Sequence, residues 1–288
     1  MSTTKVAVIG IGAMGTALAA AFLEKGYPTT IWNRTAARTA PLMDKGAHLA
    51  TSVSAAYESS NIVIFCVLNN IIVEELLRRD ASLLNGKIII NSTNGTLQEA
   101  RHLSELVLGH GAQYLHAALM AVPAHIGTDH GFIIYSGHEE AYDSIRAHLS
   151  ILGEDKYIGA DPGSASLHDS ALLSGVYGLF SGFLHAAVLV SSQQDKTAAG
   201  FMDMYVIFIT SMMDYLRALA RQIDNGNYEP LGSNLRIQVH ALKNICEVTE
   251  SQGVSAELLK PIQALVEKGV EAGHANSDIS ALRELLRR

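Results

Sequence analysis

The chain has 288 residues, of which 17% are charged, and its formal net charge is −7. This length allows two domains with sizeable cores, and the acidic balance without a basic cluster argues against nucleic-acid binding. Its two cysteines, Cys66 and Cys246, lie in apolar runs and fit a cytoplasmic protein with buried, reduced thiols. The first apolar run is broken by glycines and lacks a basic lead, so we expect no signal peptide.

Alternating β-rich and helical patterns occupy the first half of the chain. The strands are expected at 6–9, 28–32, 62–67, 87–91, 113–118 and 132–136. Helical stretches between most of them predict a doubly wound parallel sheet, the Rossmann form of an α/β fold. The strand at 6–9 runs into Gly10-Ile11-Gly12-Ala13-Met14-Gly15, and a helix-forming run follows. These glycines allow a tight turn and a close approach to a pyrophosphate, which the amides of the helix N-terminus then bind.

The residues after the strand at 28–32 select the cofactor. A site for NAD usually has Asp or Glu there, but this chain has Asn33, then Arg34, Thr35 and, one turn later, Arg38. A planar guanidinium suits a 2′-phosphate, so we expect NADPH, although a solvated basic turn has the same composition. Leu68 and Asn69, after the strand at 62–67, are expected on the nicotinamide side.

After the turn signal Asp161-Pro162-Gly163 the chain is helical to its end. Helices are expected at 164–193, 198–224, 233–252, 255–273 and 279–286, with Gly253 and Gly273 as stops and Ser255 as a cap. The predicted organisation is a cofactor-binding domain over 1–161, an interdomain helix over 162–194, and a helical dimerisation and substrate domain over 195–288.

The interdomain helix is exceptional in composition, because 170–194 contains no formal charge. Its glycines, serines and His185 favour a buried helix over a membrane span, so no membrane role is expected. One small helical domain cannot cover a helix that is apolar all round, which predicts a homodimer with interlocked helical domains and an active site shared between chains.

Three polar residues are candidates for chemistry. Asn94 follows the strand at 87–91 and either bonds a substrate or holds a turn with Gly95. Asp169 lies in the second turn of the interdomain helix, as a catalytic carboxylate or as the partner of Ser166 in a capping box. Tyr177 lies about 12 Å further along that helix and is either catalytic or a core aromatic.

No metal site is expected, because the histidines at 116, 125 and 130 are irregularly spaced. The end of the strand at 113–118 leads into Met120-Ala121-Val122-Pro123, which offers an apolar wall rather than an acid or a base.

Taken together, these motifs resemble the imine reductases, and within them the fungal-type reductive aminases. The resemblance covers nearly the whole chain. It includes Gly10-Ile11-Gly12-Ala13-Met14-Gly15, Trp32-Asn33-Arg34-Thr35, Thr93-Asn94-Gly95-Thr96, Met120-Ala121-Val122-Pro123, Ser164-Ala165-Ser166-Leu167-His168-Asp169, Leu172-Leu173-Ser174-Gly175-Val176-Tyr177-Gly178 and Gly232-Ser233-Asn234-Leu235.

The resemblance implies NADPH-dependent reduction of an imine or iminium, with Asp169, Tyr177 and Asn94 as catalytic residues. In the wider β-hydroxyacid dehydrogenase superfamily a lysine stands where Asp169 is found, and an aspartate attracts the iminium cation that a lysine repels. The implied substrate pocket contains Met120, Val122, Phe208, Met212 and Gln238. Phe208 stands where the aminases tend to have tryptophan, and His125 where an apolar residue is usual.

Two alternative functions belong to other classes. A β-hydroxyacid dehydrogenase-like enzyme would act on a carbonyl or hydroxy acid, but it calls for a lysine at position 169. A non-catalytic NADPH-binding sensor would bind the cofactor without turnover, and the polar set Asn94, Asp169 and Tyr177 argues against it.

Overall fold

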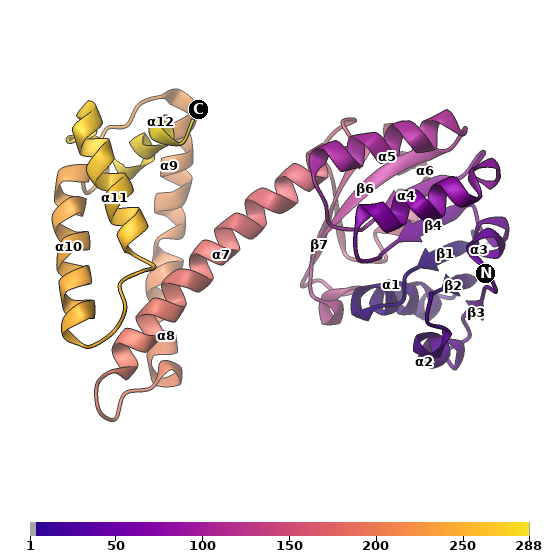
Figure 1. Cartoon of the computed structure of the whole chain (residues 1–288), viewed down its shortest axis with the longest axis horizontal. Coiled ribbons are helices and arrows are strands. Elements are labelled where there is room, and N and C mark those ends of the chain that lie inside the picture. Colours follow the sequence, from indigo (N-terminus) through magenta and orange to yellow (C-terminus); the bar gives the residue numbers. More distant parts are fainter. Residues whose placement is uncertain (1–3, 288) are drawn as a thin grey trace. The chain divides into compact units, whose positions relative to one another are not determined.

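The computed structural model describes residues 4–287. The chain divides into two compact units, Met1–Ser174 and Gly175–Arg288 (Figure 1). The division falls inside the longest helix, α7 (Ser164–Ser191). The predicted three-part organisation stays a prediction.

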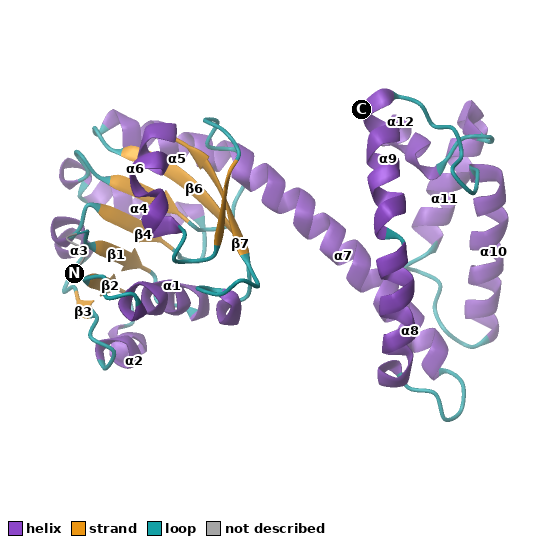
Figure 2. Ribbon diagram, turned by 180° about the vertical axis from the view of Figure 1, so that it is seen from behind, coloured by secondary structure: helices purple, strands orange, loops and turns teal. Residues whose placement is uncertain are grey.

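The N-terminal unit is built around an eight-stranded sheet in the order β3-β2-β1-β4-β5-β6-β7-β8 (Figure 2). Every neighbouring pair is parallel except β6 and β7. The strands are β1 (Val6–Ile9), β2 (Thr29–Trp32), β3 (His48–Leu49), β4 (Ile62–Phe65), β5 (Ile88–Asn91), β6 (Gln113–Met120), β7 (Phe132–Gly137) and β8 (Glu154–Tyr157).

Both faces of this sheet are covered by helices, because its central strands are apolar on both sides. Val6 and Val8 of β1 pack in the core formed with α1 (Ala13–Glu24) and α6 (Glu139–Leu149). Ala7 and Ile9 pack in the opposite core, with α3 (Val53–Ser59), α4 (Asn70–Arg79) and α5 (Leu97–Gly109). A short helix, α2 (Ala40–Met43), follows β2.

The strand order reverses next to β1, which lies between β2 and β4. In open α/β sheets, ligands bind beyond the carboxyl ends of the strands at such a reversal. The predicted Rossmann fold is therefore confirmed, and its glycine turn lies at the expected place.

Three details of the predicted sheet were wrong. The strands β3 and β8 were missed, and β7 runs antiparallel to β6 rather than parallel. A parallel pair needs a long crossover, usually a helix, whereas only a loop with a short 3₁₀ turn, Pro123–His125, connects these two strands.

The C-terminal unit is entirely helical within its described residues. After the end of α7 it contains α8 (Ala198–Ser211), α9 (Met213–Asn225), α10 (Leu235–Ser251), α11 (Lys260–Gly269) and α12 (Arg283–Leu286). Leu235, Val266 and Leu282 form its core. The buried carboxylate of Asp278 ties the unit together, accepting hydrogen bonds from the Tyr215 hydroxyl at 2.5 Å and the Leu231 N–H at 2.9 Å.

Two predicted helix boundaries in this unit were wrong. The helix expected over 198–224 breaks at Met212, which separates α8 from α9. The helix expected from Ser255 begins only at Lys260, and the Ser255 hydroxyl instead accepts from the N–H of Glu257 in a local turn. Gly253 and Gly273, the predicted stops, both adopt a positive φ.

α7 is long and apolar enough to cross a membrane by length and composition, and it is the only such helix within residues 4–287. Only 11% of its most apolar window is buried by the chain itself. The prediction of a buried helix is thus not met within a single chain.

Candidate active site

The glycine turn after β1 needs its first and last glycines for its own packing. Gly10 has φ +98°, and a Cβ there would lie 2.3 Å from the carbonyl oxygen of Cys66. A Cβ at Gly15 would lie 1.9 Å from the carbonyl oxygen of Gly10. Gly12 differs, since a Cβ there meets no atom within 4 Å. The space above Gly12 is therefore open for a ligand.

The N-terminus of α1 faces this open space. Gly12 is the N-cap, no side chain caps the helix, and no acidic residue lies in its first turn. The N–H groups of Ala13, Met14 and Gly15 thus have no partner within the helix, and they combine with the helix dipole to attract an anion. This geometry suits the pyrophosphate of a dinucleotide.

Asn33, at the end of β2, binds the protein itself through both atoms of its amide. Its Oδ1 accepts from the N–H of Ile11 at 3.0 Å, and its Nδ2 donates to the carbonyl of Thr35 at 2.9 Å. The residue therefore holds the glycine turn to the end of β2. With both amide atoms bonded to the backbone, little of this side chain remains to bind a 2′-phosphate.

Arg34, Thr35 and Arg38 are exposed beyond Asn33. Their side chains have no hydrogen-bond or ion-pair partner within residues 4–287. Two unpaired guanidinium groups and a free hydroxyl at the end of β2 fit the 2′-phosphate of NADPH, and no carboxylate is present there to bind a ribose 2′-hydroxyl.

The residues predicted on the nicotinamide side follow β4. Leu68 is 85% exposed, so its side chain is accessible to a ligand. Asn69 caps α4, because its Oδ1 accepts from the N–H of Ile72 at 3.1 Å. Its side chain has a structural role in addition to any contact with the cofactor.

Asn94 lies in the loop after β5, exposed and without a side-chain hydrogen bond within the described part of the chain. Other residues hold this loop. Thr96 and Glu99 form a capping box at the start of α5, and the Thr93 hydroxyl accepts from the N–H of Val67. A side chain at Gly95 would displace the amide of Asn70, since a Cβ would lie 1.9 Å from its Nδ2. The amide of Asn94 is thus free to bind a substrate.

Asp169 is 9% exposed in the second turn of α7, and its carboxylate has no partner among residues 4–287. Burial raises the pKa of this carboxyl above its ordinary value. The capping-box interpretation is wrong, because Ser166 lies inside the helix and its hydroxyl pairs with His116 at 2.9 Å. A buried carboxylate without a partner is suited to a cation or a proton.

Tyr177 belongs to the C-terminal unit and is 67% exposed. Its ring meets that of Phe180 edge to face, with 6.3 Å between the centroids. An exposed phenol is not a core aromatic, so the structural alternative for Tyr177 finds no support in this unit.

The predicted pocket residues fall in both units. Met120 is the last residue of β6 in the N-terminal unit, and Val122, two residues later, is 54% exposed. Phe208 lies on α8 and is 61% exposed, Met212 lies at the break before α9, and Gln238 is half-buried on α10. Each set faces solvent at least in part within its own unit.

The sequence did not predict the mutual hydrogen bonding of four further residues: Asn91, Tyr114, His116 and Ser166. They form a buried series of hydrogen bonds between β5 and α7. The only sequence signal was a polar residue at an inward position of an apolar strand, as at Asn91 and His116.

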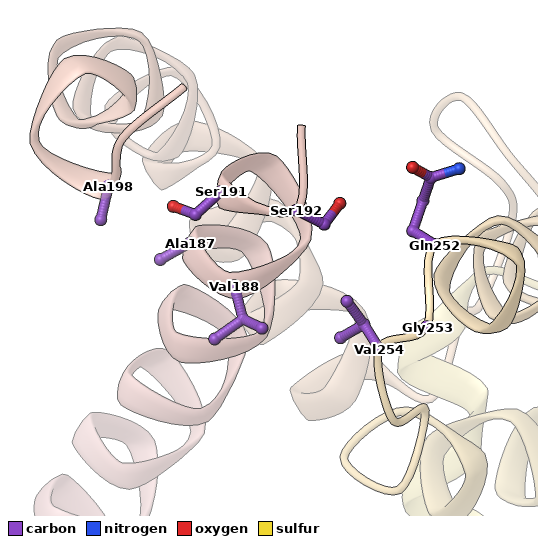
Figure 3. Close-up of a pocket in the computed structure, with 8 residues that line it drawn as sticks. All are labelled: Ala187, Val188, Ser191, Ser192, Ala198, Gln252, Gly253 and Val254. Carbon is purple, nitrogen blue, oxygen red and sulfur yellow. The ribbon is translucent and has the colours of Figure 1, made fainter. Parts of the chain in front are cut away.

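A separate apolar groove of about 470 Å³ lies in the C-terminal unit (Figure 3). It contains none of the predicted site residues. Its lining consists of Ala187, Val188, Ser191, Ser192, Ala198, Gln252, Gly253 and Val254.

Comparison with known proteins agrees with both units. Residues 5–159 match the family of NAD-binding domains of 6-phosphogluconate dehydrogenase, and residues 161–288 match the C-terminal domain of NADPH-dependent reductive aminase-like proteins. The NADPH-dependent reductive aminase of Aspergillus oryzae is 49% identical over 282 residues, which cover 97% of this chain and 96% of that protein.

Solved structures show the same relationship. A reductive aminase from Aspergillus terreus, in complex with NADPH4, cyclohexanone and allyl amine, is 48% identical, with a TM-score of 0.93 over 99% of this chain and 100% of that one. An imine reductase from Pseudomonas sp. is 28% identical, with a TM-score of 0.94 over the same shares. With a cofactor site suited to NADPH and a relative at this identity over nearly its full length, the chain belongs to the NADPH-dependent reductive aminases of the imine reductase family.

Proposed function

We propose that this protein reduces the C=N bond of an imine or iminium, formed from a ketone or aldehyde and an amine, to give an amine. The observation that carries the proposal is the buried carboxylate of Asp169, which has no partner within residues 4–287. A carboxylate of this kind stabilises an iminium cation, whereas an ammonium group at the same place repels it.

The residues of the N-terminal unit fit NADPH. The N-terminus of α1 and the open space at Gly12 would hold the pyrophosphate, and Arg34, Thr35 and Arg38 would hold the 2′-phosphate. When bound, NADPH supplies the hydride for the electrophilic carbon.

The protein's own residues then orient the substrate and move a proton. Asp169 accepts a proton from the incoming ammonium or, in its ionised form, stabilises the iminium, while Asn94 and Tyr177 orient the nitrogen and assist the proton transfer. The raised pKa of Asp169 improves its ability to accept that proton. Holding these groups in place lowers the barrier further.

The substrate pocket is proposed to include Met120, Val122, Phe208, Met212 and Gln238, with Leu68 and Asn69 beside the nicotinamide. We further propose a cytoplasmic homodimer in which a second chain covers α7 and the active site is shared. The exposed apolar residues of α7 and α8 support this assembly.

A substrate panel followed by NADPH oxidation tests the activity. The purified protein is given a cyclic imine alone, cyclohexanone with a small amine, or a short-chain keto acid. Turnover of the first two supports the proposal, and turnover of the keto acid alone supports the hydroxy-acid dehydrogenase alternative. NADPH binding without turnover of any substrate indicates a sensor.

A further inference from the structure

A buried series of hydrogen bonds, here called the polar chain, joins the sheet to the first turn of α7 in the N-terminal unit. Asn91 Nδ2 donates to the Tyr114 hydroxyl at 3.1 Å, and that hydroxyl lies 3.3 Å from His116 Nδ1. His116 Nε2 lies 2.9 Å from the Ser166 hydroxyl. All four side chains are almost fully buried.

The donors and acceptors along the polar chain have one consistent direction. The N–H of Thr93 donates to Asn91 Oδ1 at 3.0 Å, which fixes the orientation of that amide. Nδ2 of Asn91 must then donate to Tyr114, whose hydroxyl donates to Nδ1 of His116. The proton of a neutral ring therefore resides on Nε2, which donates to Ser166. Burial lowers the pKa of His116 to about 4, so the ring is neutral at ordinary pH.

At its far end the polar chain reaches the loop that carries Asn94. Asn91 Nδ2 also donates to Asn70 Oδ1 at 3.0 Å, and Asn70 Nδ2 donates to Glu99 at 3.3 Å. Glu99 in turn accepts from the N–H of Thr96 at 2.7 Å, two residues after Asn94.

At its near end the polar chain fixes α7. Ser166 and Asp169 are three residues apart and thus neighbours on the helix surface. Ala165, beside Ser166, is fully buried against Ala118 and Ile134, and its N–H donates to the Ser136 hydroxyl at 3.0 Å. The rotation of this turn about the helix axis is therefore set by contacts with the sheet.

We propose that His116 is a positioning residue: acting through Ser166, it holds the α7 turn of Asp169 in a fixed relation to the loop of Asn94. This role rests on the proposed function, because Asp169 and Asn94 are two of the three proposed catalytic residues. His116 itself does not contact the substrate.

Kinetics of matched variants test the role. Ser166→Ala and His116→Leu should each lower kcat for a preformed imine by about three- to tenfold, with the KM for NADPH unchanged, since one buried hydrogen bond to the turn is lost. His116→Gln, whose amide can still donate to Ser166, should recover most of the loss. Ser104→Ala removes another buried hydroxyl, on α5 and outside the polar chain, and should leave kcat unchanged. Wild-type kcat in Ser166→Ala overturns the proposal.

A double-mutant cycle separates positioning from general destabilisation. If Ser166 acts only through Asp169, Ser166→Ala should cause no further loss in an Asp169→Asn background. If instead the losses of kcat from the two substitutions multiply in the double variant, Ser166 does not act through Asp169 and the positioning role is contradicted. This comparison also applies if His116→Leu fails to fold.

Two measurements need no turnover and so distinguish this proposal from the proposed function. Nitrogen NMR of the wild-type protein should show the His116 ring with its proton on Nε2, and amide exchange over 167–173 should accelerate in Ser166→Ala. The opposite tautomer or unchanged exchange overturns the positioning role. Failure of the wild-type protein to reduce any imine overturns the proposed function instead, and these two measurements then decide whether the polar chain fixes the turn.

Discussion

Arg101 on α5 donates two hydrogen bonds to Asp161, the residue that begins the turn into α7. Its Nε lies 2.9 Å from Oδ1, and its Nη2 lies 2.6 Å from Oδ2. Asp161 Oδ1 also accepts from the N–H of Gly163 at 3.0 Å. Gly163 itself lies so close to α5 that a Cβ there would be 2.9 Å from Leu97. The start of α7 is thereby attached to α5 as well as to the sheet.

This ion pair predicts a pH dependence of stability. Arg101, and then the Gly163 N–H, hold the pKa of Asp161 at about 2, below the ordinary value of 3.8. A depressed acid pKa contributes stability that is present above the ordinary value and is lost as the pH falls towards 2. Both side chains of the pair are nearly half exposed and screened by solvent, so the contribution is small. Urea unfolding at a series of acidic pH values should show a shallower loss in Arg101→Gln than in wild type. Equal pH dependence in both proteins would contradict this account.

Arg34 is expected to determine the preference for NADPH. Charge-assisted hydrogen bonds to a phosphate contribute roughly 1.5–3 kcal/mol, so Arg34→Ala should raise the KM for NADPH about ten- to a hundredfold and leave NADH nearly unaffected. Steady-state kinetics with both cofactors measure the difference. Arg78→Ala, which removes an exposed arginine paired with Glu74 on α4, is the control and should change neither KM. An equal rise in KM for both cofactors would show that Arg34 does not bind the 2′-phosphate.

Substitution by alanine should have different effects at the two positions Gly12 and Gly15: a loss of stability at Gly15 and a loss of NADPH affinity at Gly12. Gly15→Ala places its Cβ 1.9 Å from a backbone oxygen and should destabilise the fold by at least about 1–3 kcal/mol. Gly12→Ala meets no protein atom and should cost about 1 kcal/mol or less, yet weaken NADPH binding by about tenfold or more. Thermal unfolding and cofactor titration separate the two effects. Normal NADPH affinity in Gly12→Ala would exclude the pyrophosphate from this turn.

Asp169→Asn should make the protein slower and more stable. Burial raises the pKa of this carboxyl, so its ionised form costs stability as the pH rises from below 3.8 through the raised pKa. The variant should therefore unfold at higher urea than wild type at neutral pH, and the difference should shrink in acid. Turnover should fall by about a hundredfold or more at unchanged NADPH affinity.

The substrate dependence of that loss reports the role of Asp169. Reductive amination should suffer more than reduction of a preformed iminium, because only the former requires a proton from the incoming ammonium. Wild-type turnover in Asp169→Asn, with NADPH binding intact, leaves Tyr177 as the better candidate.

The exposed face of α7 predicts association. Phe180 and Leu184 are 53% and 57% exposed on a helix without a formal charge between 170 and 191. Light scattering at micromolar concentration should report a dimer, and Leu184→Arg should dissociate it by placing a charge in the interface. Leu108→Arg, at an exposed position of α5, is the control and should leave the mass unchanged. A stable wild-type monomer removes the argument for a shared active site.

The parts of the fold that followed from the sequence are those with strong local patterns. Apolar strands and the glycine turn predicted the Rossmann core, because burial on both faces requires continuous apolar runs. The strand β8 was missed because Glu154–Tyr157 is mostly polar and lies at the edge of the sheet, where little burial is needed. The break at Met212 has no glycine or proline to mark it.

The candidate site was predictable in its residue types and less so in their contacts. The side chains of Arg34 and Asn94 are free within the described part of the chain, and their roles stay predictions, whereas the side chains of Asn33 and Asn69 bind the backbone. The Ser166-x-x-Asp169 spacing suggested a cap. The hydrogen-bond partner of Ser166 is His116, which lies 50 residues earlier on β6. No local sequence pattern reveals a contact at that separation.

The arrangement at the end of β2 bears on how this protein can diverge. Asn33 holds the glycine turn, whereas the side chains of Arg34 and Arg38 make no hydrogen bond or ion pair within the described residues of the chain. Substitutions at the two arginines should therefore change stability by no more than about 0.5 kcal/mol. Cofactor preference can then change by single substitutions at these arginines without loss of stability. Any change at Asn33, by contrast, removes hydrogen bonds that hold the glycine turn, and that loss of stability must be compensated elsewhere.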